Sequence, residues 1–262
     1  MKIRQPAVTG TDPDGCFARE GSLAKVTPVF APVVETARAA VAEAFGERLH
    51  SGYLYGSIPR GTARPGVSDL DLLLALRHTP TPADRAAADA LQAALDGEFA
   101  QIDGVGVLLH SAETLLSEAE RYDLGWFTAC LCTPLLGPDL AEQLPRYRPS
   151  TELARETNGD LALALPRWQS QLATVAPEKM TRYVSRKLVR SALTLVMPRW
   201  GGWTSDLAHS AEVSGHYYPE RADQLRRAAA ATPVDLPMLL DDLGPWLAAE
   251  YTAVHGTRTP RP

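Results

Sequence analysis

The sequence predicts an α/β N-terminal domain with a mixed β-sheet, followed by an all-α helical-bundle domain. Short apolar segments typical of buried strands alternate with amphipathic helical segments in the first half of the chain. Beyond residue 149 the pattern is helical, with no convincing strand. This change places the boundary near residues 145–150, so we expect one domain at residues 1–147 and another at residues 148–262.

The first domain alternates helices and strands, each with the pattern typical of its type. Val33, Ala37 and Val41 recur at helical spacing, whereas the strands are runs of apolar residues between turn residues. Thr81 is a favourable helix cap, and Pro82 suits the first helical position. The expected elements are a helix at 32–47, strands at 49–55 and 67–76, a helix at 81–99, a strand at 105–110 and a helix at 111–120.

The second domain consists of helical segments. Several of them begin with a Ser, Thr or Asp cap or with a proline in the first turn. The expected helices lie at residues 151–175, 178–197, 204–214, 219–231 and 235–254.

The charge of the chain argues against a nucleic acid as its main ligand. The formal net charge is −5, whereas proteins that bind a polynucleotide backbone usually carry a net positive surface or a dense basic stripe. A small molecule is therefore the favoured partner. No segment approaches the roughly 18 apolar residues of a membrane span, and the N-terminus has no apolar leader segment, so we expect no membrane contact and a cytoplasmic location.

The three cysteines, Cys16, Cys130 and Cys132, are expected to be reduced thiols in the core. Cys130 and Cys132 are too close in the chain for a strain-free disulfide, and their spacing lacks the second pair of ligands that a zinc site needs.

The segment between residues 53 and 76 contains the residues with the clearest chemistry. Gly56 and Ser57 follow a predicted strand and open a short helix. Glycine lets a ligand approach the backbone, and Ser57 can cap the helix while its hydroxyl and the unpaired N–H groups face an anion. We therefore expect this turn to bind phosphate.

Asp69 and Asp71 stand two positions apart on the second predicted strand. Residues at this spacing project from the same face, so both carboxylates are expected on one side, with Leu70 and Leu72 on the opposite, helix-covered side. Two like charges on one exposed face repel each other unless a cation lies between them. Mg²⁺ is typically held by a few carboxylates plus substrate phosphates, an arrangement that suits nucleotidyl transfer.

This segment resembles the signature of the DNA polymerase β-type nucleotidyltransferase superfamily. In that signature Gly-Ser is followed by about a dozen residues and then by Asp-x-Asp on a strand; here eleven residues separate Ser57 from Asp69. Arg60 and Ser68 also match it. The resemblance implies that Asp69 and Asp71 are catalytic and bind Mg²⁺, with ATP or another NTP as co-substrate held by the Gly-Ser turn.

The helical half is similar to the C-terminal domain of small-molecule members of this superfamily, such as the adenylyltransferases that act on streptomycin and spectinomycin. The similar segments are residues 186–190, 203–207 and 217–220, and residues 136–140 resemble the exit from the catalytic domain in the same members. The resemblance implies a substrate-binding helical domain and transfer of AMP from ATP to a hydroxyl of a small acceptor, either an aminoglycoside-like antibiotic or a metabolite.

Members of the superfamily usually carry a third carboxylate on a neighbouring strand. Asp103, at the beginning of the third predicted strand, is the candidate here for a catalytic role, although it is also an ordinary turn residue. If the face that bears Gly104 and Gly106 is the one facing the cleft, the third acid is absent.

Several basic residues are candidates to bind the phosphates of the nucleotide. They are Arg60 and Arg64 in the loop, and Lys187 and Arg190 in the helical domain. The basic face of the helix that carries Lys187 would be repulsive without an anion; the alternative for each residue is a solvated surface side chain. Trp168 and Tyr183 are candidates to stack on a base or sugar, with core packing as the alternative.

Two other functions are compatible with these patterns. One is a binding protein on a catalytically degenerate nucleotidyltransferase scaffold, similar to an antitoxin. The other is a nucleotidyltransferase that modifies RNA or protein; the acidic charge balance counts against RNA as its substrate.

Overall fold

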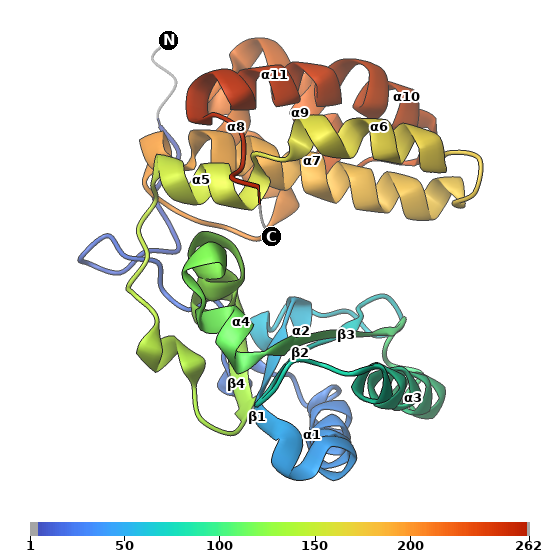
Figure 1. Ribbon diagram of the computed structural model, residues 1–262. Coiled ribbons are helices and arrows are strands. Elements are labelled where there is room, and N and C mark those ends of the chain that lie inside the picture. Colours follow the sequence, from blue (N-terminus) through green and yellow to red (C-terminus); the bar gives the residue numbers. More distant parts are fainter. Residues whose placement is uncertain (1–4, 261–262) are drawn as a thin grey trace. The chain divides into compact units, whose positions relative to one another are not determined.

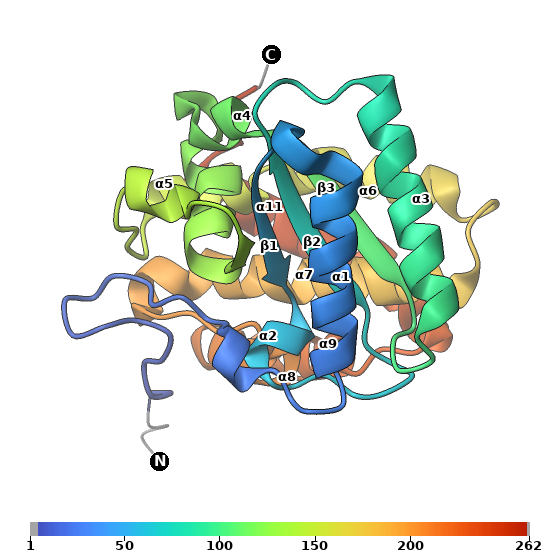
Figure 2. The same cartoon turned by 90° about the horizontal axis from the view of Figure 1, so that it is seen from below.

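The structure, a computed structural model that describes residues 5–260, divides into two compact units (Figures 1 and 2). The sheet unit comprises Ala18–Tyr147, and the helical unit comprises Met1–Phe17 together with Arg148–Pro262. The chain thus divides after Tyr147, whereas the sequence predicts domains at residues 1–147 and 148–262, and residues 5–17 belong to the helical unit.

Contacts with Trp203 explain this placement of the N-terminal segment. The backbone N–H of Trp203 donates a hydrogen bond to the Thr9 carbonyl at 2.8 Å. The Phe17 and Trp203 rings meet edge to face, with centroids 6.2 Å apart. Gly10 lies so close to the Trp203 carbonyl that a Cβ there would be 2.3 Å from its oxygen. Segments almost two hundred residues apart in the chain therefore pair, which no local pattern indicates.

The sheet unit is built on a mixed four-stranded sheet in the order β3-β2-β1-β4. Its strands are β1 (Leu49–Tyr55), β2 (Leu70–Leu76), β3 (Val105–Ser111) and β4 (Thr133–Leu136). β1 is antiparallel to β2 and β4, whereas β2 and β3 are parallel. The mixed sheet predicted from the sequence is confirmed, and β1 has the bounds that its apolar run predicts.

Two helices cover one face of this sheet, as Figure 2 shows. They are α1 (Ala31–Phe45) and α3 (Pro82–Glu98), which pack against a row of alternate leucines of β2 that starts at Leu70. Each leucine side chain buried in this way contributes about 1.5–3 kcal/mol. α3 begins at its predicted cap, Thr81, where Thr81 and Asp84 form a reciprocal capping box.

The opposite face of the sheet is covered only in part. Tyr53, Leu73 and Ala75 pack there against α4 (Ala112–Leu116) and against Cys132 and Leu140. Two consecutive π-helical turns, Arg121–Gly125 and Phe127–Leu131, lead from α4 toward β4. Asp71 and Leu73 are neighbours on this face of β2, because side chains alternate along a strand. The apolar cluster includes Leu73 but not Asp71.

The helical unit is a bundle around α7, whose residues are mostly buried over its last five turns. The helices are α5 (Thr151–Asn158), α6 (Leu161–Gln171), α7 (Pro177–Trp200), α8 (Leu207–Tyr217), α9 (Ala222–Ala229), α10 (Leu236–Met238) and α11 (Gly244–His255). The segment 151–175 forms two helices instead of one, because the chain turns at Gly159, where a Cβ would lie 2.4 Å from the Arg155 carbonyl oxygen. The segment 235–254 is likewise divided, by a π-helical turn at Leu239–Leu243.

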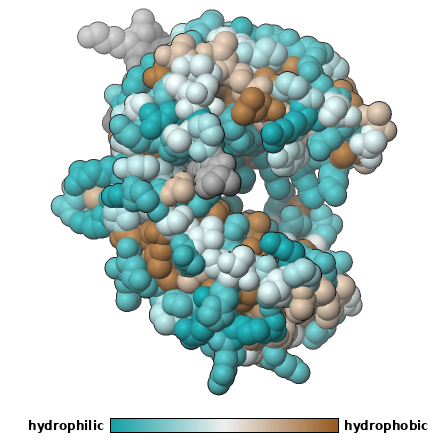
Figure 3. Space-filling model, in the orientation of Figure 1, coloured by the Kyte–Doolittle hydropathy of each residue, from teal (hydrophilic) through white to brown (hydrophobic). Residues whose placement is uncertain are grey.

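The three cysteines lie in the core, as the sequence predicts. Cys16, Cys130 and Cys132 are buried and free. Between residues 5 and 260 no helix has the length and apolar character to cross a membrane. Hydrophilic residues occupy most of the face shown in Figure 3, with apolar residues in smaller patches.

Candidate active site

The Gly-Ser turn lies directly after β1. Gly56 has a φ of 82° and a ψ of −153°, a backbone conformation that is open to glycine and strained for other residues. It is the N-cap of α2 (Ser57–Arg60), and Ser57 is the first helical residue. The expectation that Ser57 caps the helix is therefore wrong, because Gly56 occupies the N-cap position.

Gly56 packs against the carboxylate of Asp71. Tyr55 is the register partner of Asp71 in the antiparallel pair of β1 and β2, so the turn follows immediately beside that carboxylate. A Cβ at position 56 would lie 2.4 Å from Asp71 Oδ2, a distance that real Cβ atoms do not show. Glycine is thus required twice, by the backbone conformation and by the contact, and the turn and the carboxylate form one unit.

Asp69 and Asp71 both lie beside the glycines of β3. Asp71 is in register with Gly106, where a Cβ would be 3.4 Å from Asp71 Oδ1. Asp69 comes just before β2, and a Cβ at Gly104 would be 3.7 Å from Asp69 Oδ1. Because Gly104 and Gly106 share one face of their strand, the two carboxylates lie on one face of the sheet, as their spacing predicts.

β3 contributes no acid to this face. The parallel register pairs Leu73 with Leu108 and Ala75 with His110, so glycine, leucine and histidine occupy the face beside the carboxylates. The glycine face of β3 is therefore the face that adjoins Asp69 and Asp71. The glycines are visible in the sequence, but only the pairing of β2 with β3 shows that they leave room beside Asp69 and Asp71.

Asp103 is exposed and precedes β3. Its backbone N–H donates to the Ser68 carbonyl at 3.1 Å. Among residues 5–260 no three His, Cys, Asp or Glu side chains are grouped so that they could hold a metal ion. The structure thus does not join Asp103 with Asp69 and Asp71 in a three-carboxylate metal site, and its catalytic role stays a prediction.

The loop before Asp69 is tethered at several points. Ser68 Oγ accepts a hydrogen bond from the Arg64 N–H at 2.9 Å, and the Gly66 N–H donates to the Gln101 carbonyl at 2.8 Å. The Leu70 N–H donates to the Gly104 carbonyl at 2.9 Å. These bonds hold the approach to β2 against the start of β3 and so define where Asp69 lies.

Arg60, a candidate for phosphate binding, ends α2. Its guanidinium lies 3.7 Å from Glu20 Oε2, and both side chains are largely shielded. An ion pair of this length is weak, so Arg60 has a counter-ion that a phosphate could replace. Its role in nucleotide binding stays a prediction.

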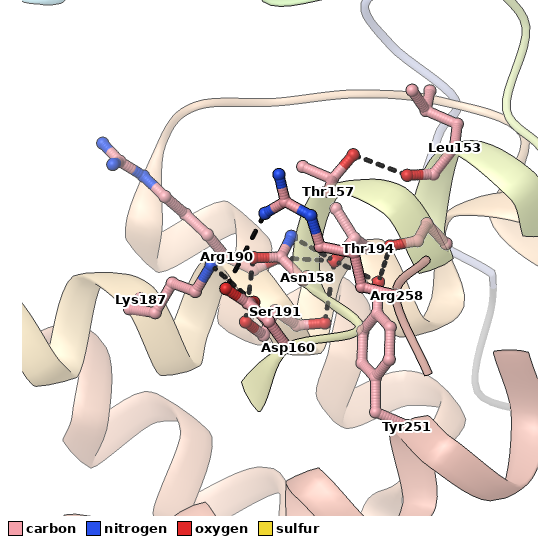
Figure 4. A network of polar contacts seen from close by, with 11 residues as sticks. Leu153, Thr157, Asn158, Asp160, Lys187, Arg190, Ser191, Thr194, Tyr251 and Arg258 are labelled. Atoms are coloured by element: carbon pink, nitrogen blue, oxygen red, sulfur yellow. Dashed lines mark hydrogen bonds and ion pairs between the residues drawn. The ribbon is translucent and has the colours of Figure 1, made fainter. Parts of the chain in front are cut away.

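Lys187 lies in the helical unit, in the polar network that Figure 4 shows. Lys187 Nζ is 3.4 Å from Asp160 Oδ1, and Arg258 approaches Asp160 Oδ2 at 3.7 Å. Asp160 is therefore an anion within the chain that balances the basic face of α7. Arg190 follows one turn later and is exposed. The phosphate-binding roles of Lys187 and Arg190 stay predictions.

A buried polar cluster supports β1 on the same face as Asp71. Tyr53 Oη accepts a hydrogen bond from the Leu140 N–H at 2.7 Å and lies 3.4 Å from Asp139 Oδ1. Burial raises the pKa of Tyr53 to about 12. Burial tends to raise the pKa of Asp139, but the hydrogen bonds and charge of Arg19, together with hydrogen bonds from the Ala141 N–H and Tyr53, lower that pKa overall. Sequence reasoning missed the cluster, because its members come from three separate segments.

Replacing Tyr53 with phenylalanine is expected to reduce the free energy of unfolding by about 1–3 kcal/mol, because the buried Leu140 N–H loses its acceptor. Because the pKa of Tyr53 is raised from about 10 in the unfolded chain to about 12 in the fold, its contribution is complete below pH 10 and is lost as the pH rises toward 12. Urea unfolding at about pH 8 and about pH 11 should show that the difference between wild type and variant shrinks at the higher pH. Tyr183→Phe, at an exposed tyrosine, is the control, and equal stability of both variants would contradict the prediction.

These features define a class of protein. A mixed sheet covered by two helices on one face, with a Gly-Ser turn against a carboxylate pair on the other, is a nucleotidyltransferase fold with a helical C-terminal part.

Among solved structures, the crystal structure of spectinomycin adenyltransferase AAD(9) from Enterococcus faecialis, with ATP and spectinomycin, is similar to this chain. The match covers 84% of this chain and 98% of that chain, with a TM-score of 0.50 and 14% sequence identity. At this identity the likeness shows the fold. No family model matches the sequence, and no curated protein does.

Proposed function

We propose that this protein is a Mg²⁺-dependent nucleotidyltransferase that moves AMP from ATP onto a hydroxyl of a small molecule. The contact between Gly56 and the Asp71 carboxylate carries the proposal, because it places the turn that we expect to bind phosphate beside a carboxylate that we expect to bind the metal. The shared fold with an adenyltransferase whose structure contains ATP and spectinomycin supports ATP as the donor and a small molecule as the acceptor.

The residues present suit a magnesium ion. Asp69 and Asp71 offer carboxylate oxygens on one face, and the adjoining Gly104 and Gly106 have no side chains that would fill the space beside them. Mg²⁺ commonly takes only one or two protein carboxylates and completes its shell with water and substrate phosphates, so a third acid is not required for binding. When bound, the ion would neutralise negative charge on the triphosphate.

The chain's own groups would orient the donor. Ser57 and the backbone of the turn would bind the terminal phosphates, in a position next to Asp71 that Gly56 makes accessible. Lys187 and Arg190 would bind phosphate oxygens from the helical unit. The face of β3 beside Asp69 and Asp71 has no acid, so the proton of the acceptor hydroxyl would pass to Asp103, to a group of the helical unit or to the substrate itself.

A screen of pyrophosphate release tests the proposal. Each of the four NTPs would be combined with a panel of hydroxyl-bearing antibiotics, sugars and metabolites, with and without Mg²⁺. We expect release with ATP that depends on both Mg²⁺ and one class of acceptor. Mass spectrometry of the acceptor should show the added AMP.

One observation favours a second candidate function, a binding protein on this scaffold: the glycine face of β3 lacks the usual third acid. Such a protein would bind ATP without turning it over. ATP binding measured by calorimetry, together with no pyrophosphate release for any acceptor, would favour the binding protein over the enzyme.

Lys187→Gln is expected to raise the KM for ATP by about tenfold, because a charge-assisted hydrogen bond to a phosphate oxygen is lost. Arg186→Gln removes a neighbouring exposed cation of α7 and is the matched control. Steady-state kinetics at varied ATP, with thermal unfolding to check the fold, would measure the effect. A KM that moves no more in Lys187→Gln than in Arg186→Gln would remove Lys187 from the nucleotide site.

A further inference from the structure

A cavity of about 390 Å³ lies within the helical unit, between α6 and α7. Its wall includes Asp160, Arg167, Trp168, Lys179, Tyr183 and Lys187. This volume falls within the range of small-molecule sites in proteins, which hold a ring system with one or two substituents. All of its lining residues belong to the helical unit.

One side of the cavity is aromatic. Trp168 is buried, with 3% of its surface exposed, whereas Tyr183 is 57% exposed. The two rings meet at right angles, with centroids 5.8 Å apart. Trp168 therefore supports the Tyr183 ring from one side, while the rest of that ring stays accessible for stacking. Packing in the core thus explains Trp168, but it does not explain the exposed ring of Tyr183.

The polar part of the wall is positively charged. Three of the lining side chains, Arg167, Lys179 and Lys187, are cations, and Asp160 is the one lining carboxylate. Asp160 already lies near two cations, Lys187 at 3.4 Å and Arg258 at 3.7 Å (Figure 4). Within the described part of the chain, neither the Arg167 side chain nor that of Lys179 has a hydrogen-bond or ion-pair partner. Such a wall attracts an anion and repels a polycation.

We propose that this cavity binds a small molecule that carries a phosphate or carboxylate group beside a planar ring. The ring would stack on Tyr183, and the acidic group would be bound by Arg167 and Lys179. This inference goes beyond the proposed function, because it concerns binding of a ligand in the cavity, which can be measured without nucleotidyl transfer. A nucleotide and an acidic acceptor share the required chemistry, and the experiment separates them.

Calorimetry on the whole protein with four probes of one ring system tests the inference. The probes are naphthyl phosphate, naphthoate, naphthol and naphthylmethylamine, which differ in the charge of a single substituent. We expect the two acids to bind roughly tenfold more tightly than naphthol, with the amine weakest. Equal affinity for the acids and naphthol would overturn the proposal.

Variants locate the binding. Arg167→Gln combined with Lys179→Gln should reduce the affinity for naphthyl phosphate to that for naphthol, and Tyr183→Ala should weaken every ring probe. Arg186→Gln and Leu163→Ala change exposed residues of α7 and α6 that do not line the cavity, and they should bind as wild type does. All five substituted positions are exposed, so thermal unfolding should confirm intact folds. Unchanged affinity in the Arg167 and Lys179 double variant would refute the assigned site.

Competition with ATP shows whether the ligand of the cavity is the nucleotide or a separate acidic molecule. If ATP displaces naphthyl phosphate in wild type and its own affinity falls in the double variant, the cavity binds the nucleotide. If ATP and naphthyl phosphate bind together, the cavity binds a separate acidic molecule. Both results support an anion site, and both can be obtained even if no acceptor is ever nucleotidylated.

Discussion

Replacing Asp71 with asparagine is expected to abolish Mg²⁺-dependent nucleotidyl transfer while leaving the fold intact. Asparagine keeps the size of the side chain beside Gly56 but removes the negative charge that would bind the metal. Because bound metal contributes several kcal/mol of charge stabilisation in the transition state, we expect kcat to fall by about a thousandfold or more. Asp69→Asn should have a comparable effect.

The matched control is Asp96→Asn, at an exposed position near the end of α3. It makes the same chemical change in the same unit, away from the glycines of β3. Pyrophosphate release would measure activity, and urea unfolding would show whether each variant keeps the stability of the parent. Full activity in the Asp71→Asn protein would rule out the metal-binding role of this carboxylate.

Replacing Gly56 with alanine is expected to reduce both activity and stability. A Cβ would lie 2.4 Å from Asp71 Oδ2 and would force the carboxylate or the turn to move. The positive φ adds a backbone cost of about 1–2 kcal/mol for an L-residue. Displacement of a catalytic group by about 1 Å commonly costs about a hundredfold in rate, so kcat should fall by that order.

Gly46→Ala separates the effect of backbone strain from the effect of the contact with Asp71. Gly46 also has a positive φ, 49°, but a Cβ there would meet no atom within 4 Å. This variant should therefore have a similar backbone strain and a normal kcat. If Gly56→Ala and Gly46→Ala lose stability equally and both keep full activity, the contact between Gly56 and Asp71 has no part in catalysis.

Features that depend on residues close together in the chain could be predicted from the sequence. The apolar run of β1, the Thr81 cap with Pro82 behind it, and the helical spacing from Val33 to Val41 each define an element. The same holds for the Gly-Ser turn and the carboxylate pair, because alternation along a strand places Asp69 and Asp71 on one face whatever the strand pairs with. These are local rules of period, capping and turn geometry.

Which side chains come into contact, by contrast, depends on how distant segments pack in the fold. The parallel pairing of β2 with β3 sets Gly106 beside Asp71, and a shift of one residue would have put a valine there instead. Likewise, Asp160 meets Lys187 because the chain turns at Gly159 between α5 and α6. Such contacts depend on segments distant in sequence coming into register, and the free energy that selects the register comes from burial of the whole core, which no single segment contains.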